Sequence, residues 1–209
     1  FCFICLCALT ISFIYKINLS NLTKAFELNQ FLLNFNIYTK NGGAVSDLIT
    51  HWEYIQVLRQ NFPNLFSYEM AVDTKILNFP LHNIIFSQLY FLSDNLKNYL
   101  LYYFCFSLIL PYIFYLCLLE RFKEINKPLL IILSSIIYIF PVFQYSAIWG
   151  SSHISSLFFF LLGILFHIKF KISEFKKINY VILSIVFLAV ASYIKQYYVF
   201  FFFFIFLEF

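Results

Sequence analysis

The side chains able to hold or move a proton are sparse in this chain, and several lie between residues 42 and 92. Asp47 and His51 are four residues apart, so on a helix they share a face one turn apart. His82 follows in the same stretch, and Lys195 interrupts an apolar run much later in the chain. Carboxylates and imidazoles serve as general bases, and a lysine can hold a developing anion. These residues are therefore the first candidates for a functional site.

Each candidate also has a structural interpretation. Asp47 favours the positive N-terminal end of a helix dipole whether or not it does chemistry. Lys195 can extend its ammonium group from an apolar segment to the membrane interface. His153, at the mouth of an apolar run, fits a hydrogen-bonded structural role as well as a functional one. The His, Cys, Asp and Glu residues lack a metal-specific spacing, so the sequence predicts neither a metal site nor a cofactor.

The composition places these residues in a membrane protein. Of the 209 residues, 62% are hydrophobic and only 11% are charged, whereas an average soluble domain has about 25% charged residues. The formal net charge of +4 comes mostly from lysines between apolar runs, as expected of anchors beside membrane spans. The composition therefore predicts an integral membrane protein in contact with membrane lipid, and it excludes the basic face of a nucleic-acid-binding protein.

Apolar runs about as long as the hydrocarbon core of a bilayer predict the spans. The run at residues 1–15 is short for a span, which needs roughly 20 residues. Later spans are expected at residues 99–119, 128–145, 153–166, 180–194 and 197–209. We therefore predict an all-α polytopic transmembrane bundle that forms a single domain over residues 1–209. Because the sequence opens without Met and stops within a phenylalanine run, we expect an N-terminal fragment that is incomplete at both ends.

Residues 16–98 are predicted to form a long first loop that precedes the spans at 99–209. In this loop Ser46 is expected to cap an amphipathic helix whose first turn contains Asp47. Pro80 is expected to begin a second amphipathic helix over residues 81–92. Both helices would lie at the membrane interface.

The distribution of basic residues predicts the orientation. The loop at 120–127 carries three Lys or Arg residues, and the loop at 167–177 carries four. The positive-inside rule places both loops in the cytoplasm. The first loop, with the candidate site, is therefore expected on the exoplasmic side.

Two short motifs in the first loop carry a resemblance to a known family. Ser46-Asp47-x-x-x-His51-Trp52-x-Tyr54 and Asn78-Phe79-Pro80-Leu81-His82-Asn83 resemble the first luminal loop of the GT-C superfamily of glycosyltransferases. The chain looks like the group that contains protein O-mannosyltransferases and lipid A aminoarabinose transferases. Lys195-Gln196 also resembles a Lys-Gln pair that these enzymes often place at the exoplasmic end of a helix.

The resemblance implies transfer of a sugar from a polyprenyl-phosphate-linked donor to a lipid, glycan or protein acceptor. The site would face the exoplasmic side of the bacterial inner membrane or of the endoplasmic reticulum. Asp47 would be the general base that accepts the proton of the acceptor, and Lys195 and Arg59 would hold the donor phosphate. The further substrate contacts expected from the resemblance are His51, His82, His153 and Gln196.

The sequence departs from the family pattern at three points. Leu48 stands where many relatives carry a second acid, and only the Pro80-Leu81 pair remains of a longer proline-containing element. Gln144 and His153 occupy a link in which many relatives have another Asp. The lack of a second acid favours a metal-independent mechanism, or an inactive copy of the enzyme.

Two other classes of function stay open at this point. A polytopic transporter or flippase component usually places polar residues, or helices broken at Gly or Pro, near the middle of the membrane. The predicted spans have almost wholly apolar middles, which favours chemistry at the membrane surface. A non-catalytic subunit of a cell-envelope complex fits the composition equally well, and activity alone separates it from an enzyme.

Overall fold

The structure is a computed structural model that describes residues 43–61, 81–89, 96–148 and 150–202. Every regular element within these ranges is helical, which confirms the predicted all-α class. The helices are α5 (Gly43–Asn61), α7 (Leu81–Gln88), α9 (Leu96–Ser107), α10 (Leu110–Arg121), α11 (Lys127–Ser135), the 3₁₀ helix η1 (Ile136–Ile139), α12 (Pro141–Ile148), α13 (Ser152–Ile172), α14 (Ile178–Ile194) and the 3₁₀ helix η2 (Gln196–Tyr198). The predicted spans at 1–15 and beyond residue 202, and the predicted helix start at Pro80, lie outside the described residues.

Two segments of the described part are long and apolar enough to cross a membrane, judged by length and composition. Asn98–Arg121 has 24 residues, and Ser152–Ile172 has 21. The apolar helical segments over Lys127–Ile139 and Ile178–Ile194 are shorter. All four coincide with predicted spans, and two of them reach the roughly 20 residues that a span needs.

The predicted span at residues 128–145 is helical but interrupted. α11 ends at Ser135, η1 follows, and α12 begins at Pro141. Proline has no backbone N–H and its ring clashes with the carbonyl four residues earlier, so an α-helix cannot continue unchanged through Pro141. This predicted span therefore consists of three short helices in a row.

A second interruption lies within the predicted span at 99–119. A turn at residues 108–109 separates α9 from α10, just before Pro111. The Tyr138 hydroxyl of η1 donates to the Leu108 carbonyl at 3.1 Å. The two interruptions are thus joined by a hydrogen bond.

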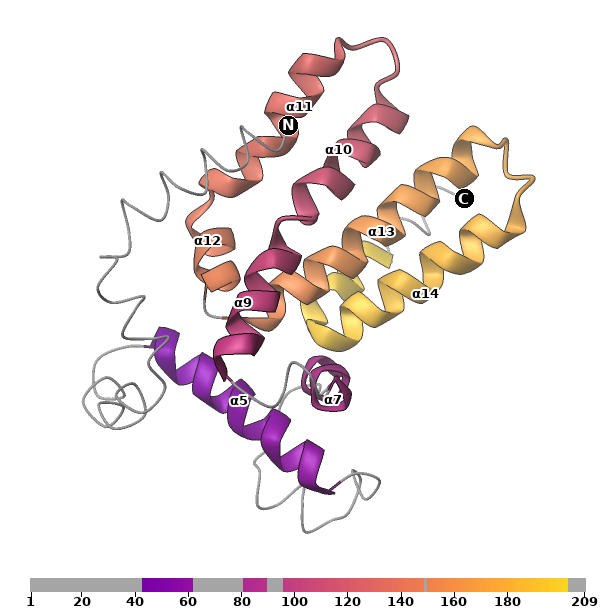
Figure 1. Cartoon of the computed structure of the whole chain (residues 1–209). Coiled ribbons are helices and arrows are strands. Elements are labelled where there is room, and N and C mark those ends of the chain that lie inside the picture. Colours follow the sequence, from indigo (N-terminus) through magenta and orange to yellow (C-terminus); the bar gives the residue numbers. More distant parts are fainter. Residues whose placement is uncertain (1–42, 62–80, 90–95, 149, 203–209) are drawn as a thin grey trace.

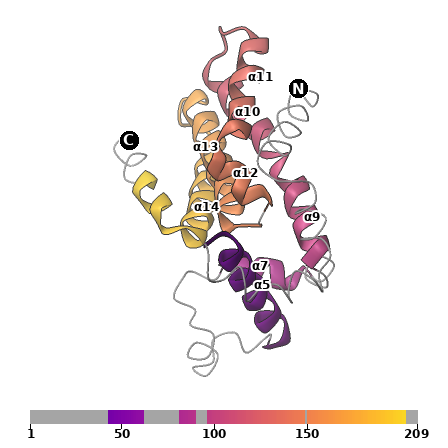
Figure 2. The ribbon, with the colours of Figure 1, turned by 90° about the vertical axis from the view of Figure 1, so that its left-hand side faces the viewer.

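α5 and α7 lie together at one end of the other helices (Figures 1 and 2). α5 begins at Gly43, so Ser46 and Asp47 are inside the helix and the predicted cap at Ser46 is wrong. No proline precedes Ser46 to stop a helix, and each residue added to a helix gains one backbone hydrogen bond. α5 therefore begins about one turn earlier than a cap at Ser46 would allow. α7 begins at Leu81 as expected but ends at Gln88, so the predicted extent of this helix to residue 92 is wrong, because Leu89 is not helical.

α13 is the central helix, with α10 on one side and α14 on the other (Figure 1). α13 approaches α14 closely at Gly163, where an added Cβ would stand 2.6 Å from Leu188 Cγ. The Ser184 hydroxyl donates to the Gly163 carbonyl at 2.9 Å. The absence of a side chain at Gly163 therefore permits both the packing and the hydrogen bond.

The turn after α13 ends the helix with a Schellman motif. The Phe175 N–H donates to the Phe170 carbonyl at 3.2 Å, and the Glu174 N–H donates to the Lys171 carbonyl at 3.0 Å, which are the two bonds that define the motif. The Phe170 and Phe175 rings meet edge to face with centroids 5.2 Å apart. Glu174 and Phe175 have φ angles of 51° and 63°, a left-handed backbone that glycine adopts at lower cost.

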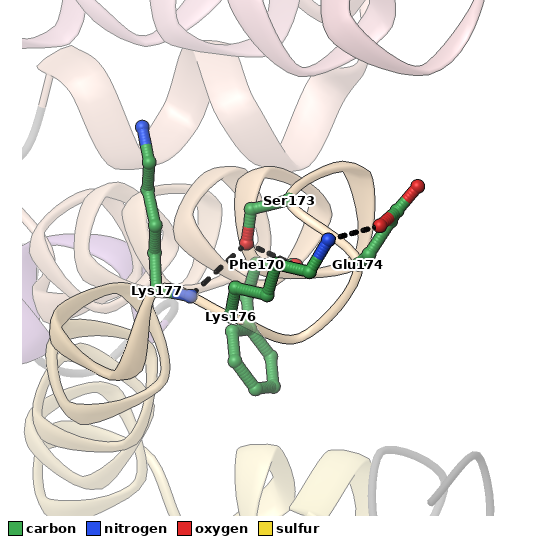
Figure 3. A network of polar contacts seen from close by, with 5 residues as sticks. All are labelled: Phe170, Ser173, Glu174, Lys176 and Lys177. Carbon is green, nitrogen blue, oxygen red and sulfur yellow. Dashed lines mark hydrogen bonds and ion pairs between the residues drawn. The ribbon is translucent and has the colours of Figure 1, made fainter.

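Side chains in this turn add further polar contacts (Figure 3). Ser173 Oγ donates to the Phe170 carbonyl at 2.7 Å and accepts the Lys177 N–H at 3.4 Å. Lys176 Nζ lies 2.5 Å from Glu174 Oε2. Because both side chains of this ion pair are 76% exposed, the pair contributes little to stability.

Candidate functional site

His82 lies where α7 meets α9 and α13, and only 2% of its surface is exposed. Its Nδ1 is 2.8 Å from Ser155 Oγ on α13. Its Nε2 is 3.2 Å from the Tyr99 hydroxyl on α9. Both ring nitrogens are thus engaged by protein groups, and the imidazole ties α7 to two helices of the bundle.

These contacts continue to backbone carbonyls on either side. The Tyr99 hydroxyl lies 2.6 Å from the Gly150 carbonyl, and Ser155 Oγ lies 3.0 Å from the Ser152 carbonyl. Gly150 has a φ of 61°, and an added Cβ would stand 2.6 Å from Tyr99 Cε1. A glycine is required there because of both its backbone conformation and the close ring. A continuous row of polar contacts therefore runs from Gly150 through His82 to Ser152.

A second tyrosine holds the first turn of α13. The Tyr103 hydroxyl donates to the Ser151 carbonyl and accepts the Ser155 N–H at 3.2 Å. The Tyr103 hydroxyl thus contacts both the Ser151 carbonyl and the Ser155 N–H, two groups four residues apart at the start of α13. Its ring stacks on Tyr99 with centroids 5.6 Å apart. The two tyrosines together position the start of α13 against α9.

His51 brings α5 to the same place. Its Nδ1 is 3.0 Å from Asn83 Oδ1 on α7, and its ring meets the His82 ring edge to face at 5.2 Å between centroids. An amide oxygen only accepts hydrogen bonds, so this contact places a proton on Nδ1 of His51. α5 and α7 are joined through these polar side chains next to His82.

The electrostatic environment of His82 disfavours its charged form. Burial lowers the pKa of His82 well below the ordinary value of 6.5, and the nearby charges of His51 and Lys195 lower the pKa further. Removing an imidazolium from water is costly, so His82 is neutral at physiological pH. Lys195 directly follows α14, which contacts α7.

Lys195 and Gln196 interrupt the chain after α14, as the sequence predicts. Lys195 has extended backbone angles, with φ −138° and ψ 113°, and η2 begins at Gln196. The Lys195 N–H still bonds to the Ala191 carbonyl at 2.9 Å. Gln196 is exposed. The break places Lys195 at the end of α14 that also carries contacts to α7.

His153 borders a separate, mostly apolar cavity. Its Nδ1 is 2.9 Å from the Tyr197 hydroxyl, and the two rings stack. The cavity has a volume of about 290 Å³. A second cavity of about 270 Å³ continues from it, and the two share Ile137, Phe140 and Leu157.

The structure brings His51 and His82 together, places Lys195 after α14, which contacts α7, and directs His153 elsewhere. His153 and Ser155 are two residues apart on α13, which places them on nearly opposite faces of the helix. Arg59 is half-buried in the last turn of α5, about 12 Å along the helix from His51. Asp47 lies one turn before His51 in α5, as expected, but its side chain is outside the described part.

Sequence reasoning did not single out the hydroxyls and the glycine that hold His82. Tyr99 and Tyr103 are four residues apart at the start of an apolar run, a spacing that places two polar tips on one helix face. The start of α13 reads Ser-Ser-His-Ile-Ser-Ser from residue 151, a cluster of polar side chains beside an apolar segment. Polar groups at such positions are costly to bury without partners. The tyrosine spacing and the serine cluster were therefore the sequence features from which partners elsewhere in the fold could have been predicted.

Comparisons of the chain with protein-family models, with curated proteins and with solved structures find no match. Any functional assignment therefore depends on the residues and on the geometry of this chain.

Proposed function

We propose that the protein is a multi-pass membrane glycosyltransferase that moves a sugar from a polyprenyl-phosphate donor to an exoplasmic acceptor. The observation that carries the proposal is the position of Lys195. Lys195 directly follows α14, which contacts α7, and Tyr197, two residues later, lines the apolar cavity. A cation two residues before the lining of an apolar cavity, at the end of a helix that contacts α7, suits a phosphate that joins a sugar to a hydrocarbon chain.

The donor would be bound in two parts. Lys195 would hold the phosphate, because a cation stabilises the charge that the leaving phosphate develops. The hydrocarbon chain would enter the cavity beside Tyr197 and continue into the second cavity, whose linings are mainly apolar. Joined, the two spaces fall within the about 300–1,000 Å³ typical of ligand pockets. The sugar would then lie toward α5 and His51.

The acceptor would be activated from α5. Asp47 lies one helical turn before His51, and we propose that its carboxylate is the general base. As the acceptor oxygen or nitrogen bonds to the anomeric carbon, its proton passes to Asp47. The bond from that carbon to the phosphate oxygen breaks, and the phosphate leaves with the electron pair beside Lys195. We expect no metal ion in this step, because the chain lacks a second acid next to Asp47.

The distribution of basic residues supports an exoplasmic site. The turns after α10 and α13, together with the helix ends that adjoin them, contain most of the Lys and Arg residues of the described bundle and lie at the end opposite α5 and α7 (Figure 1). The positive-inside rule assigns these turns to the cytoplasm. α5 and α7 would then face the periplasm or the lumen.

A second candidate, a transporter or flippase component, is favoured by the interrupted helices. Breaks near Pro111 and at Pro141 are typical of helices that rearrange around a transported solute. The serines near the second break, Ser134 and Ser135, both donate to the Ile131 carbonyl of their own helix. These two hydroxyls therefore form hydrogen bonds within their own helix. The enzyme remains the better-supported proposal.

The test is sugar transfer by the full-length protein in membranes supplied with a labelled polyprenyl-phosphate sugar. We expect transfer by the wild type and a loss of about 10²–10⁴-fold in Asp47→Asn, the usual contribution of a general base. Lys195→Gln is expected to lose transfer as well. Lys176→Gln, which removes an exposed cation at the far end of α13, is the matched control and keeps the wild-type rate.

The other outcomes separate the alternatives. Wild-type transfer that survives Asp47→Asn contradicts the assignment of the base but leaves the class of enzyme in place. No transfer with any of several donors, together with movement of a labelled lipid or solute across the membrane, contradicts the enzyme and supports the transporter. The absence of both sugar transfer and transport would support a non-catalytic subunit.

A further inference from the structure

We propose that His82 takes up one proton when an anionic phosphodiester binds beside Lys195, so that ligand binding and proton uptake are coupled. This inference rests on the anion site of the proposed function. His82 is here a positioning residue, because its ring is buried and both nitrogens face protein groups.

A count of protons in the row of contacts through His82 carries the argument. The row has four contacts: Gly150 O to Tyr99 Oη, Tyr99 Oη to His82 Nε2, His82 Nδ1 to Ser155 Oγ, and Ser155 Oγ to Ser152 O. Each contact needs one proton to be a hydrogen bond. A neutral imidazole, one phenol and one serine hydroxyl supply three. One contact is therefore left without a proton while His82 is neutral.

The position of the missing proton depends on the tautomer. With the proton on Nε2, His82 donates to Tyr99, Tyr99 donates to Gly150, and Ser155 donates to His82, so the Ser152 carbonyl receives nothing from Ser155. With the proton on Nδ1, the row reverses and the Gly150 carbonyl receives nothing from Tyr99. A protonated His82 donates from both nitrogens, and all four hydrogen bonds form together. The geometry of the site thus fits the imidazolium better than either neutral tautomer.

The surrounding charges oppose the imidazolium in the absence of a ligand. Among the residues that the structure describes, the titratable groups that face or act on His82 are His51 on α5, Tyr99 and Tyr103 on α9, and Lys195 after α14. The phenols are neutral near pH 7, and burial together with the charges of His51 and Lys195 lowers the pKa of His82. A bound anion beside Lys195 offsets these positive charges and favours protonation. The proton then completes the one contact that each neutral tautomer leaves without a hydrogen bond, at the Ser152 or the Gly150 carbonyl.

The test is isothermal titration calorimetry of the full-length protein in lipid nanodiscs at pH 7. The probe is dodecyl methyl phosphate, a phosphodiester that carries one fixed negative charge and does not itself titrate near pH 7. Titrations in two buffers that differ in ionisation enthalpy measure the protons taken up on binding. We expect uptake of up to about one proton per bound probe in the wild type, and weaker binding as the pH is raised.

Three variants isolate the residue that takes up the proton. His82→Gln removes the proton-binding group and is expected to abolish the uptake. Ser155→Ala keeps His82 but removes two of the four contacts, so a neutral imidazole satisfies the remaining two and the uptake is also expected to disappear. His167→Gln changes another buried histidine near the far end of α13, and we expect it to retain the uptake. Thermal unfolding of each variant checks that it is folded.

The outcomes distinguish this inference from the proposed function. Failure of the wild type to bind the probe contradicts the anion site, and with it both proposals. Binding without proton uptake, or uptake that persists in Ser155→Ala, overturns the coupling and leaves the transferase proposal standing. If His82→Gln does not fold, Ser155→Ala alone decides, because it keeps the imidazole in place.

Discussion

At the scale of single residues, His82 connects the segment before the bundle to the bundle itself through two side-chain hydrogen bonds. A histidine in this position makes stability depend on pH. The pKa of His82 is lower in the folded protein than the 6.5 of an exposed histidine. Below about pH 6.5 the unfolded chain therefore binds more protons than the folded chain, and the free energy of unfolding decreases as the pH falls.

We expect the midpoint of thermal unfolding without ligand to fall between pH 7.5 and pH 5, and to fall less steeply in His82→Gln. One group contributes a slope of at most about 1.4 kcal/mol per pH unit. The measurement is a set of unfolding curves in detergent over this pH range. Curves with the same pH dependence in the wild type and the variant would assign the effect to other groups.

The Tyr99 hydroxyl supports a second prediction at this scale. Tyr99→Phe removes the group that meets both His82 and the Gly150 carbonyl, and it leaves buried polar atoms without a partner. We expect a loss of about 1–3 kcal/mol in the free energy of unfolding. The matched control is Tyr112→Phe, at a side chain that is 51% exposed, with an expected effect within about 0.5 kcal/mol. Equal effects of the two changes would contradict the role of the Tyr99 hydroxyl.

At the scale of elements, the turn between α13 and α14 carries strain that one substitution can release. Glu174 occupies the left-handed position of the Schellman motif, where glycine is usual. Glu174→Gly is expected to raise the free energy of unfolding by about 1 kcal/mol. Glu174→Ala removes the same ion pair to Lys176 but keeps a Cβ, so it is the control and gains nothing. A stabilisation of the same size in both variants would assign the effect to the lost charge.

The contact between α13 and α14 supports a prediction of the opposite sign. Gly163→Ala places a Cβ against Leu188, and such overpacking costs typically about 1–3 kcal/mol. Leu188→Ala in the same chain removes the side-chain atoms that the new Cβ would meet. We therefore expect the double variant to be less destabilised than the sum of the single variants. Additive losses, measured by thermal or denaturant unfolding, would show that Gly163 does not limit the approach of the helices.

At the scale of the whole molecule, the proposed orientation can be measured directly. Single cysteines at Gln60→Cys in α5 and Lys176→Cys after α13 replace exposed side chains near opposite ends of the described structure (Figure 1). We expect a membrane-impermeant maleimide to label position 60 from the exoplasmic side and position 176 from the cytoplasmic side. The unsubstituted protein controls for its native cysteines. Labelling of both positions from one side would contradict the proposed topology.

Much of the local structure followed from short-range patterns. The apolar runs predicted the helices at 99–119, 153–166 and 180–194. Such predictions succeed because the length and periodicity of an apolar run are local properties of the sequence. The break at Lys195 and the helix that places Asp47 and His51 one turn apart were also predicted. The start of α5 was misplaced because a capping residue is only a local preference, which further helical hydrogen bonds can override.

By itself the sequence determined an all-helical, strongly apolar chain with few ionisable groups, since composition and helical periodicity are local properties. Only the tertiary structure decided which of those groups meet. The contact of His82 with Ser155 joins residues 73 positions apart, and that of Tyr99 with Gly150 joins residues 51 apart. No periodicity within a segment encodes such pairs, because they depend on how α7, α9 and α13 pack against one another. A buried imidazole must find hydrogen-bond partners wherever packing places them, and here packing placed them on two other helices.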